Sequence, residues 1–142
     1  MDDPQQTRKD IEHLRQLAIF HFVAAGLAFL GICFICLHYM IFRTVFADPS
    51  LFANTKGGPP PEQLFAIFKI FYIVAVVWFV LSGLGNVLSA IYLRQRRNRT
   101  FSMVVAGFNC LYMPLGTVLG VFTLVVLSRD SVVAIYDSKP PA

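Results

Sequence analysis

Apolar residues gather in three long runs along the chain, from Leu17 to Phe42, from Leu64 to Leu93 and from Phe101 to Leu127. A helix of about 20 apolar residues spans the roughly 30 Å hydrocarbon layer of a bilayer, and each run is longer than that. Lys69 is the only Lys, Arg, Asp or Glu inside any run. The pattern therefore predicts an all-α fold, an integral membrane helical bundle with three long transmembrane segments.

The remaining residues are too few for a second globular core, so we expect a single transmembrane domain, 1–142. Its water-facing parts are an amino end (1–16), an outer loop (43–63), a basic loop (94–100) and a tail (128–142). The transmembrane segments are then 17–42, 64–93 and 101–127.

Pro114 and Gly116 interrupt the third run near its centre. Proline removes a backbone donor and clashes with the preceding turn, so the run either kinks there or turns back as a re-entrant hairpin. We expect a kinked span, because non-helical backbone at membrane depth must be buried in protein or line a wet cavity. Arg129 and Lys139 in the tail favour the alternative, a hairpin that returns the tail to the cytoplasm.

Charged residues make up only 14% of the chain, and the formal net charge is +4. Basic residues set orientation, because Lys and Arg are retained on the cytoplasmic side of a membrane. Four of them crowd the connection before the third run: Arg94, Arg96, Arg97 and Arg99. We expect this connection and the amino end to be cytoplasmic, with the four arginines near anionic lipid headgroups.

Small and polar residues inside the runs predict where the helices pack, since lipid gives apolar helices no hydrophobic reason to associate. The third run carries one such strip: Asn109, Gly116, Gly120 and Thr123. The second run carries another: Ser82, Gly85, Asn86 and Ser89. We expect the two asparagines to bridge helices, with a conduction path as the alternative.

Catalysis needs a positioned acid, base or nucleophile, and no Asp or Glu occurs between Glu62 and Asp130. We therefore expect no enzyme activity. Cys33, Cys36 and Met40 share one helical face and could suit Cu(I), but a single helix rarely completes a coordination shell. We expect no metal and no cofactor.

His21 and His38 lie near opposite ends of the first run. We expect each to be an interfacial or helix-bridging group, with a proton relay as the alternative.

Two segments, His13–Val23 (HLRQLAIFHFV) and Met113–Arg129 (MPLGTVLGVFTLVVLSR), cover about a fifth of the chain. Together they resemble a group of small uncharacterised bacterial integral membrane proteins. The resemblance implies a bacterial inner-membrane location and a short amphipathic tail of the type Ser131–Tyr136. Asp130 stands where such proteins often have a proline, which predicts that the last helix continues past it. The resemblance adds nothing catalytic.

Two functions remain. The first is a structural or accessory subunit that packs its polar and small-residue strips in a larger or homo-oligomeric assembly. The second is a homo-oligomeric pore or small transporter lined by Ser82, Asn86, Ser89, Asn109, Thr117 and Thr123. The expected partners are membrane lipid and membrane polypeptides, including further copies of the chain; we expect neither nucleic acid nor a small-molecule substrate.

Overall fold

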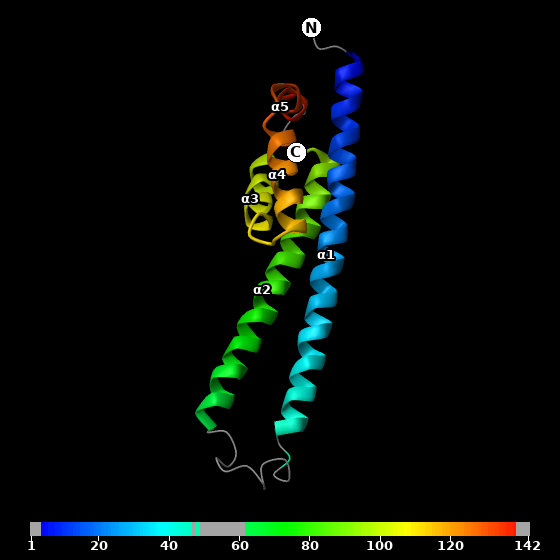
Figure 1. Cartoon of the computed structure of the whole chain (residues 1–142). Coiled ribbons are helices and arrows are strands. Elements are labelled where there is room, and N and C mark those ends of the chain that lie inside the picture. The colour runs from blue at the N-terminus through cyan, green and yellow to red at the C-terminus, as the bar shows by residue number, and fades with distance from the viewer. Residues whose placement is uncertain (1–3, 47, 49–61, 139–142) are drawn as a thin grey trace. The chain divides into compact units, whose positions relative to one another are not determined.

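A computed structural model of the chain describes residues 4–46, 48 and 62–138. These residues form five α-helices and contain no strand: α1 (Pro4–Phe46), α2 (Glu62–Gln95), α3 (Arg99–Asn109), α4 (Leu115–Leu127) and α5 (Asp130–Asp137) (Figure 1). The prediction of an all-α fold is confirmed. Both α1 and α2 are long and apolar enough to cross a membrane. Most of the predicted outer loop and the end of the tail, including Lys139, lie outside the described residues.

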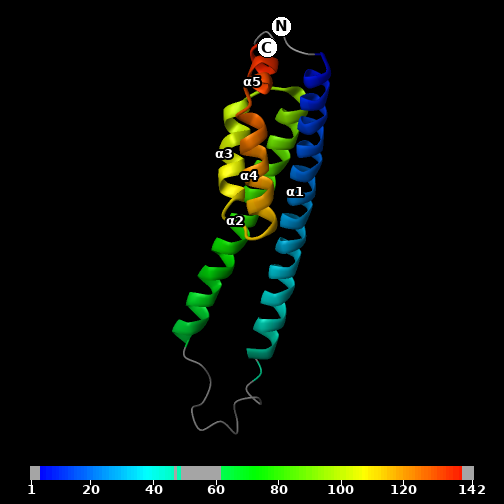
Figure 2. The same ribbon diagram turned by 45° about the horizontal axis from the view of Figure 1, so that its top comes forward.

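The third apolar run does not form one long helix. It divides into α3 and α4, separated by a turn at residues 110–114. The two helices pack side by side (Figure 1, Figure 2), and Arg99 at the start of α3 donates a hydrogen bond from Nε to the carbonyl oxygen of Leu127 at the end of α4, at 2.7 Å. They are therefore antiparallel, and our prediction of a kinked continuous span is wrong.

Thr117 satisfies two backbone carbonyls of the turn, which helps the chain to reverse here. Thr117 donates from Oγ1 to the carbonyl oxygen of Cys110 at 2.9 Å, and its backbone N–H donates to the carbonyl oxygen of Tyr112 at 3.0 Å. The Met113–Pro114 peptide bond inside the turn is cis. We expected a kinked span because unpaired backbone N–H and C=O groups in a non-helical turn are costly at membrane depth. The hydrogen bonds of Thr117 remove part of that cost.

Gly116 and Gly120 let α4 approach α3 closely. A Cβ atom at Gly116 would lie 2.5 Å from the carbonyl oxygen of Asn109. At Gly120 it would overlap the carbonyl oxygen of Ala106 and lie 2.6 Å from Sγ of Cys110. Backbone oxygens cannot swing aside as side chains do, so both positions need glycine. The GxxxG sequence thus joins two helices of the same chain.

The described residues fall into two compact units. The bundle unit comprises those up to Leu27 and from Ser82 onward, and the two-helix unit comprises those from Ala28 to Leu81. The core of the bundle unit collects apolar side chains of α1, α2, α4 and α5: Leu14, Leu17, Ala18, Ala90, Leu93, Val126, Leu127 and Val132. Most recur at spacings of three or four residues, as in helices that each bury one face.

The short helix α5 turns away from α4 by 70°. Arg129 between them has an extended backbone, with φ −70° and ψ 135°, which ends the helical run. The prediction that the last helix continues past Asp130 is therefore wrong. The tail beyond it is helical, and α5 buries Val132 in the core of the bundle unit.

In the two-helix unit, α1 and α2 run antiparallel along an aromatic seam. From one contacting pair to the next, the residue number rises on α1 and falls on α2, in steps of three, four or seven residues. The pairs are Gly31 with Phe79, His38 with Tyr72, Phe42 with Phe68, and Phe46 with Phe65. Among the described residues of this unit, Ala28 is the only one that is buried.

Candidate functional site: a polar cluster from four helices

Four helices of the bundle unit each contribute one polar side chain to a shared cluster. The members are His21 of α1, Asn86 of α2, Asn109 of α3 and Thr123 of α4, with exposed fractions of 0%, 2%, 4% and 0%. Helical spacing places them in the interior. His21, for example, follows the core residue Leu14 by two turns and so lies on the same face of α1.

The two asparagines of the cluster bond reciprocally. Asn86 donates from Nδ2 to Oδ1 of Asn109 at 3.1 Å, and Asn109 donates from Nδ2 to Oδ1 of Asn86 at 2.8 Å. Nδ2 of Asn86 also donates to the carbonyl oxygen of Ser82 at 2.9 Å. A backbone carbonyl only accepts, so this contact fixes which end of the Asn86 amide is nitrogen.

His21 joins this amide pair to α4. Its Nδ1 lies 2.7 Å from Oδ1 of Asn86, an acceptor, so Nδ1 carries a hydrogen. Its Nε2 lies 3.3 Å from Oγ1 of Thr123, which donates its own hydrogen to the carbonyl oxygen of Leu119 at 2.7 Å. An imidazolium donates at both nitrogens and satisfies this arrangement. A neutral ring needs the Thr123 hydroxyl to turn its hydrogen from Leu119 toward Nε2.

The chemistry available to this cluster is narrow. It contains one titratable ring, two amides and one hydroxyl, and neither a carboxylate nor a thiol takes part in its hydrogen bonds. Hydrogen bonds between side chains of four helices hold those helices in one register. The geometry suits helix bridging.

The predicted packing residues of α2 have different surroundings. Ser82 is half-buried and contributes its carbonyl oxygen to the cluster. Ser89 is fully buried, and its hydroxyl has no hydrogen-bond partner among the described residues; the same holds for Ser102 of α3. A Cβ atom at Gly85 would meet Val105 at 3.6 Å, an ordinary contact, so this position does not require glycine.

The basic loop makes a tight reversal between α2 and α3. Arg96 and Asn98 have left-handed backbones, with φ of 53° and 47°. Arg94 and Arg97 are exposed, whereas Arg96 and Arg99 are half-buried. The bond from Arg99 to the last carbonyl of α4 is a charge-assisted C-terminal cap, so this arginine closes the open end of the hairpin.

Tyr136 of α5 lies beside this loop. Burial raises the pKa of its hydroxyl to about 12, although the nearby Arg99 and Arg96 act in the opposite direction. The ring is therefore neutral at physiological pH, and it packs against the apolar core of the bundle unit.

An ion pair that the sequence did not reveal ties α1 to the residue between α4 and α5. Arg129 places Nη1 3.5 Å from Oδ1 of the fully buried Asp10 and 3.4 Å from Nδ1 of His13. Asp10 precedes the core residue Leu14 by one turn, which is the only sequence signal that it faces inward. Nothing in the local pattern pairs it with Arg129, more than 100 positions away.

The soft side chains considered for metal binding lie in the two-helix unit. Cys33, Cys36 and Met40 are all exposed on α1. In the described part of the chain, no group of three or more His, Cys, Asp or Glu residues could hold a metal ion. His38 instead places Nδ1 2.6 Å from the hydroxyl of Tyr72 and so bridges α1 and α2.

Comparison of the chain with protein-family models, with curated proteins and with solved structures finds no match. Function is therefore inferred from geometry, burial and charge alone.

Proposed function

We propose that this protein is a non-enzymatic integral membrane protein that acts through helix contacts, as a structural or accessory subunit of a larger or homo-oligomeric assembly. The observation that carries the proposal is the direction in which the polar groups point. The amide, imidazole and hydroxyl groups of the cluster are buried and bonded inside the bundle unit, while large apolar side chains of α1 and α2 are exposed. Such a surface suits lipid and the helices of other membrane polypeptides.

The α3–α4 hairpin fits a re-entrant element better than a spanning one. Its helices of 11 and 13 residues are roughly 16 and 20 Å long, shorter than the roughly 30 Å hydrocarbon layer. Its tip is apolar, with Leu111, Met113 and Leu115 exposed by 69%, 85% and 71%. Its open end carries Arg99 and Arg129. An apolar tip and a charged base are the pattern of a hairpin that enters the membrane from one side.

The orientation proposed for the chain follows from these charges. The amino end, the basic loop and α5 would lie on the cytoplasmic side of a bacterial inner membrane, where lysines and arginines are retained. Arg94 and Arg97, both exposed, would lie near anionic headgroups.

The pore alternative is weaker for a specific reason. Of the residues that would line a pore, Asn86 and Asn109 bond to each other, and Thr123 bonds to the Leu119 carbonyl and contacts the His21 ring, all within a single chain. Thr117 is occupied in the hairpin turn. A lining whose polar groups are already bonded offers few donors or acceptors to a passing ion.

The test is the mass of the native assembly. The untagged full-length chain, extracted in mild detergent, should migrate well above the 15.9 kDa protomer after correction for detergent, with further copies or other membrane polypeptides present in fixed ratio. A lone protomer without a stoichiometric partner would contradict the proposal. Ion flux through liposomes that contain only this chain, abolished by Asn86→Leu, would favour the pore.

A further inference from the structure

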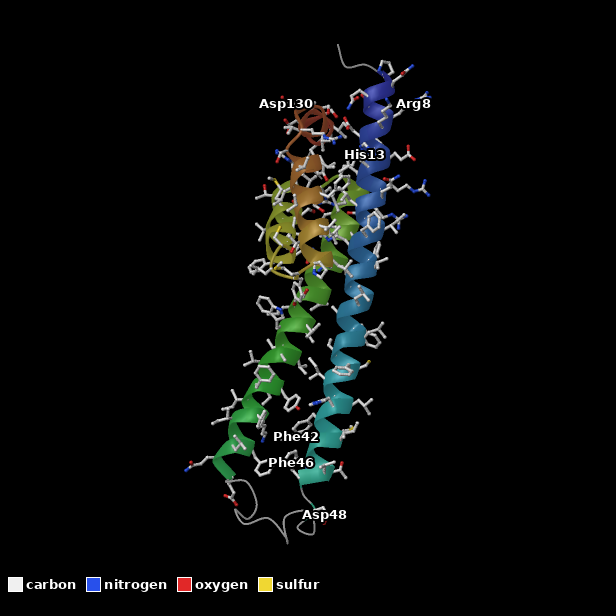
Figure 3. The ribbon with its side chains drawn as sticks, viewed as in Figure 1. Arg8, His13, Phe42, Phe46, Asp48 and Asp130 are labelled. Carbon is white, nitrogen blue, oxygen red and sulfur yellow. The ribbon has the colours of Figure 1, made fainter. Side chains whose placement is uncertain are left out.

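A cavity of about 380 Å³ opens between α1 and α2 in the two-helix unit. This volume lies near the lower end of the range for small-molecule sites. The wall is mainly aromatic, and Phe42 and Phe46 point from α1 toward α2 (Figure 3). The lining residues are Tyr39, Phe42, Arg43, Phe46, Phe65, Ala66, Phe68 and Lys69.

Two cations face this cavity without a counter-charge. Arg43 and Lys69 form no ion pair with any other described residue, and no acidic residue lines the cavity. They lie at a similar level on facing helices, because their neighbours Phe42 and Phe68 are in contact, with tilted rings whose centroids are 5.1 Å apart. Cationic side chains next to lipid and without a partner are costly. The site is therefore incomplete without an anion.

The position of the cations limits what the anion can be. Arg43 lies one turn before the end of α1, and Lys69 lies two turns after the start of α2. In helices that cross a membrane, these depths correspond to the boundary between headgroups and acyl chains. The ligand must also cover an aromatic wall, so it combines a negative charge with apolar chain.

We propose that this cavity binds the headgroup of an anionic phospholipid. The phosphate would lie between Arg43 and Lys69, and the adjoining glycerol and upper acyl chain would cover the rings of Phe42 and Phe68. A cavity of this size holds the head of a lipid but not its tails, which would continue over exposed apolar residues such as Ile70. A zwitterionic lipid fits less well, because Arg43 and Lys69 repel its cationic group.

Native mass spectrometry of the delipidated full-length chain tests the proposal, with phosphatidylglycerol and phosphatidylcholine as probes. The wild-type chain should bind phosphatidylglycerol at least tenfold more tightly than phosphatidylcholine. R43Q/K69Q should lose at least tenfold of the phosphatidylglycerol affinity, since a basic residue at a membrane surface contributes about fivefold. The matched control R8Q/K9Q removes two exposed cations near the start of α1 in the bundle unit and should change affinity less than twofold.

Equal losses in the two double variants would overturn the site, because binding would then follow total charge. An unchanged affinity in R43Q/K69Q would overturn it as well. If the double variant does not fold, R43Q and K69Q are measured singly, and the charge-preserving R43K should retain wild-type affinity.

A competition arm separates a lipid from free phosphate. Inorganic phosphate at millimolar concentration should not displace phosphatidylglycerol, whereas displacement would show that the cavity is a phosphate site and not a lipid site. Phe68→Leu keeps both cations while removing a ring from the wall. It should weaken phosphatidylglycerol binding by about threefold, and an unchanged affinity would exclude the acyl chain from the wall.

Discussion

The bundle unit and the two-helix unit use the same two long helices in different ways. In the bundle unit, α1 and α2 bury apolar and polar side chains against α3 and α4, and the side chains of His21, Asn86 and Asn109 are joined by hydrogen bonds. In the two-helix unit, they contact along aromatic rings, and most large side chains are exposed while most of those along the seam are half-buried. Phe34 and Phe71 are each 67% exposed.

This contrast shows which contacts specify a structure and which only fill space. Hydrogen bonds between buried amides fail when partners shift by one residue, whereas an aromatic ring finds another ring at several neighbouring positions. Phe42 alone approaches Phe65, Phe68 and Tyr72. We therefore expect single substitutions to cost more in the bundle unit, and the following predictions test that difference.

The largest effect is expected at Gly120. In Gly120→Leu the new side chain meets the backbone of α3, and the hairpin cannot close, so the free energy of unfolding should fall by about 3 kcal/mol. The measurement is equilibrium unfolding in mixed micelles. Gly107→Leu is the matched control: it lies on α3, nothing lies within 4 Å of its Cβ position, and it should stay within about 1 kcal/mol of wild type. Similar losses in both variants would show that α3 and α4 do not pack as described.

The next effect is expected in the amide pair. Asn86→Leu leaves the Asn109 amide and Nδ1 of His21 without their partner and should lower the free energy of unfolding by about 1–2 kcal/mol. Asn109→Leu should cost a similar amount. The double variant should cost less than the two single variants together, with a coupling of about 0.5–1 kcal/mol. Strict additivity would mean that the two amides do not interact.

A smaller effect is expected at the ion pair between Asp10 and Arg129. The two atoms are 3.5 Å apart and Arg129 is partly exposed, so Asp10→Asn should cost about 0.5 kcal/mol. The loss of stability should shrink as the salt concentration is raised from about 0.05 M to about 0.5 M, because dissolved ions screen exposed charges. A loss that does not depend on salt would show that Asp10 acts by packing and not by charge.

The smallest effect is expected at Gly31 in the two-helix unit. A Cβ atom there would meet the ring edge of Phe79, a side chain that can rotate away, and alanine favours the helix by up to about 1 kcal/mol over glycine. Gly31→Ala should therefore change the free energy of unfolding by less than about 0.5 kcal/mol. Gly120→Ala, measured alongside, should be clearly destabilising. Equal changes in the free energy of unfolding for the two variants would contradict the proposed difference between the units.

The long helices could be predicted from the sequence because their apolar runs are nearly free of charge. The hairpin could not, because Pro114 permits either a kink or a reversal. The choice depends on contacts between residues several positions apart, such as Thr117 with Cys110 and Gly120 with Ala106. Helical spacing identified Gly116 and Gly120 as close-packing positions, but it could not say that their partner is α3 of the same chain.

The polar cluster shows the same limit. Asn86, Asn109 and Thr123 stood out as polar residues in apolar runs, and His21 was expected to be interfacial or to bridge helices. That these four side chains meet depends on the register of α3 against α1 and α2, which follows from the turn of the basic loop. The left-handed backbones of Arg96 and Asn98 set that turn. Asparagine adopts this conformation more readily than most residues but arginine does not, so the sequence gives only a weak local sign of it.

The hydroxyl of Thr123 can rotate to donate its hydrogen to either of two acceptors, the Leu119 carbonyl or the His21 ring. A rotation about one C–O bond is therefore enough to fit the ring with or without its second hydrogen. The surrounding backbone need not move when the hydroxyl changes acceptor, so such a switch would alter the vibrations of the threonine and leave the helix axes in place.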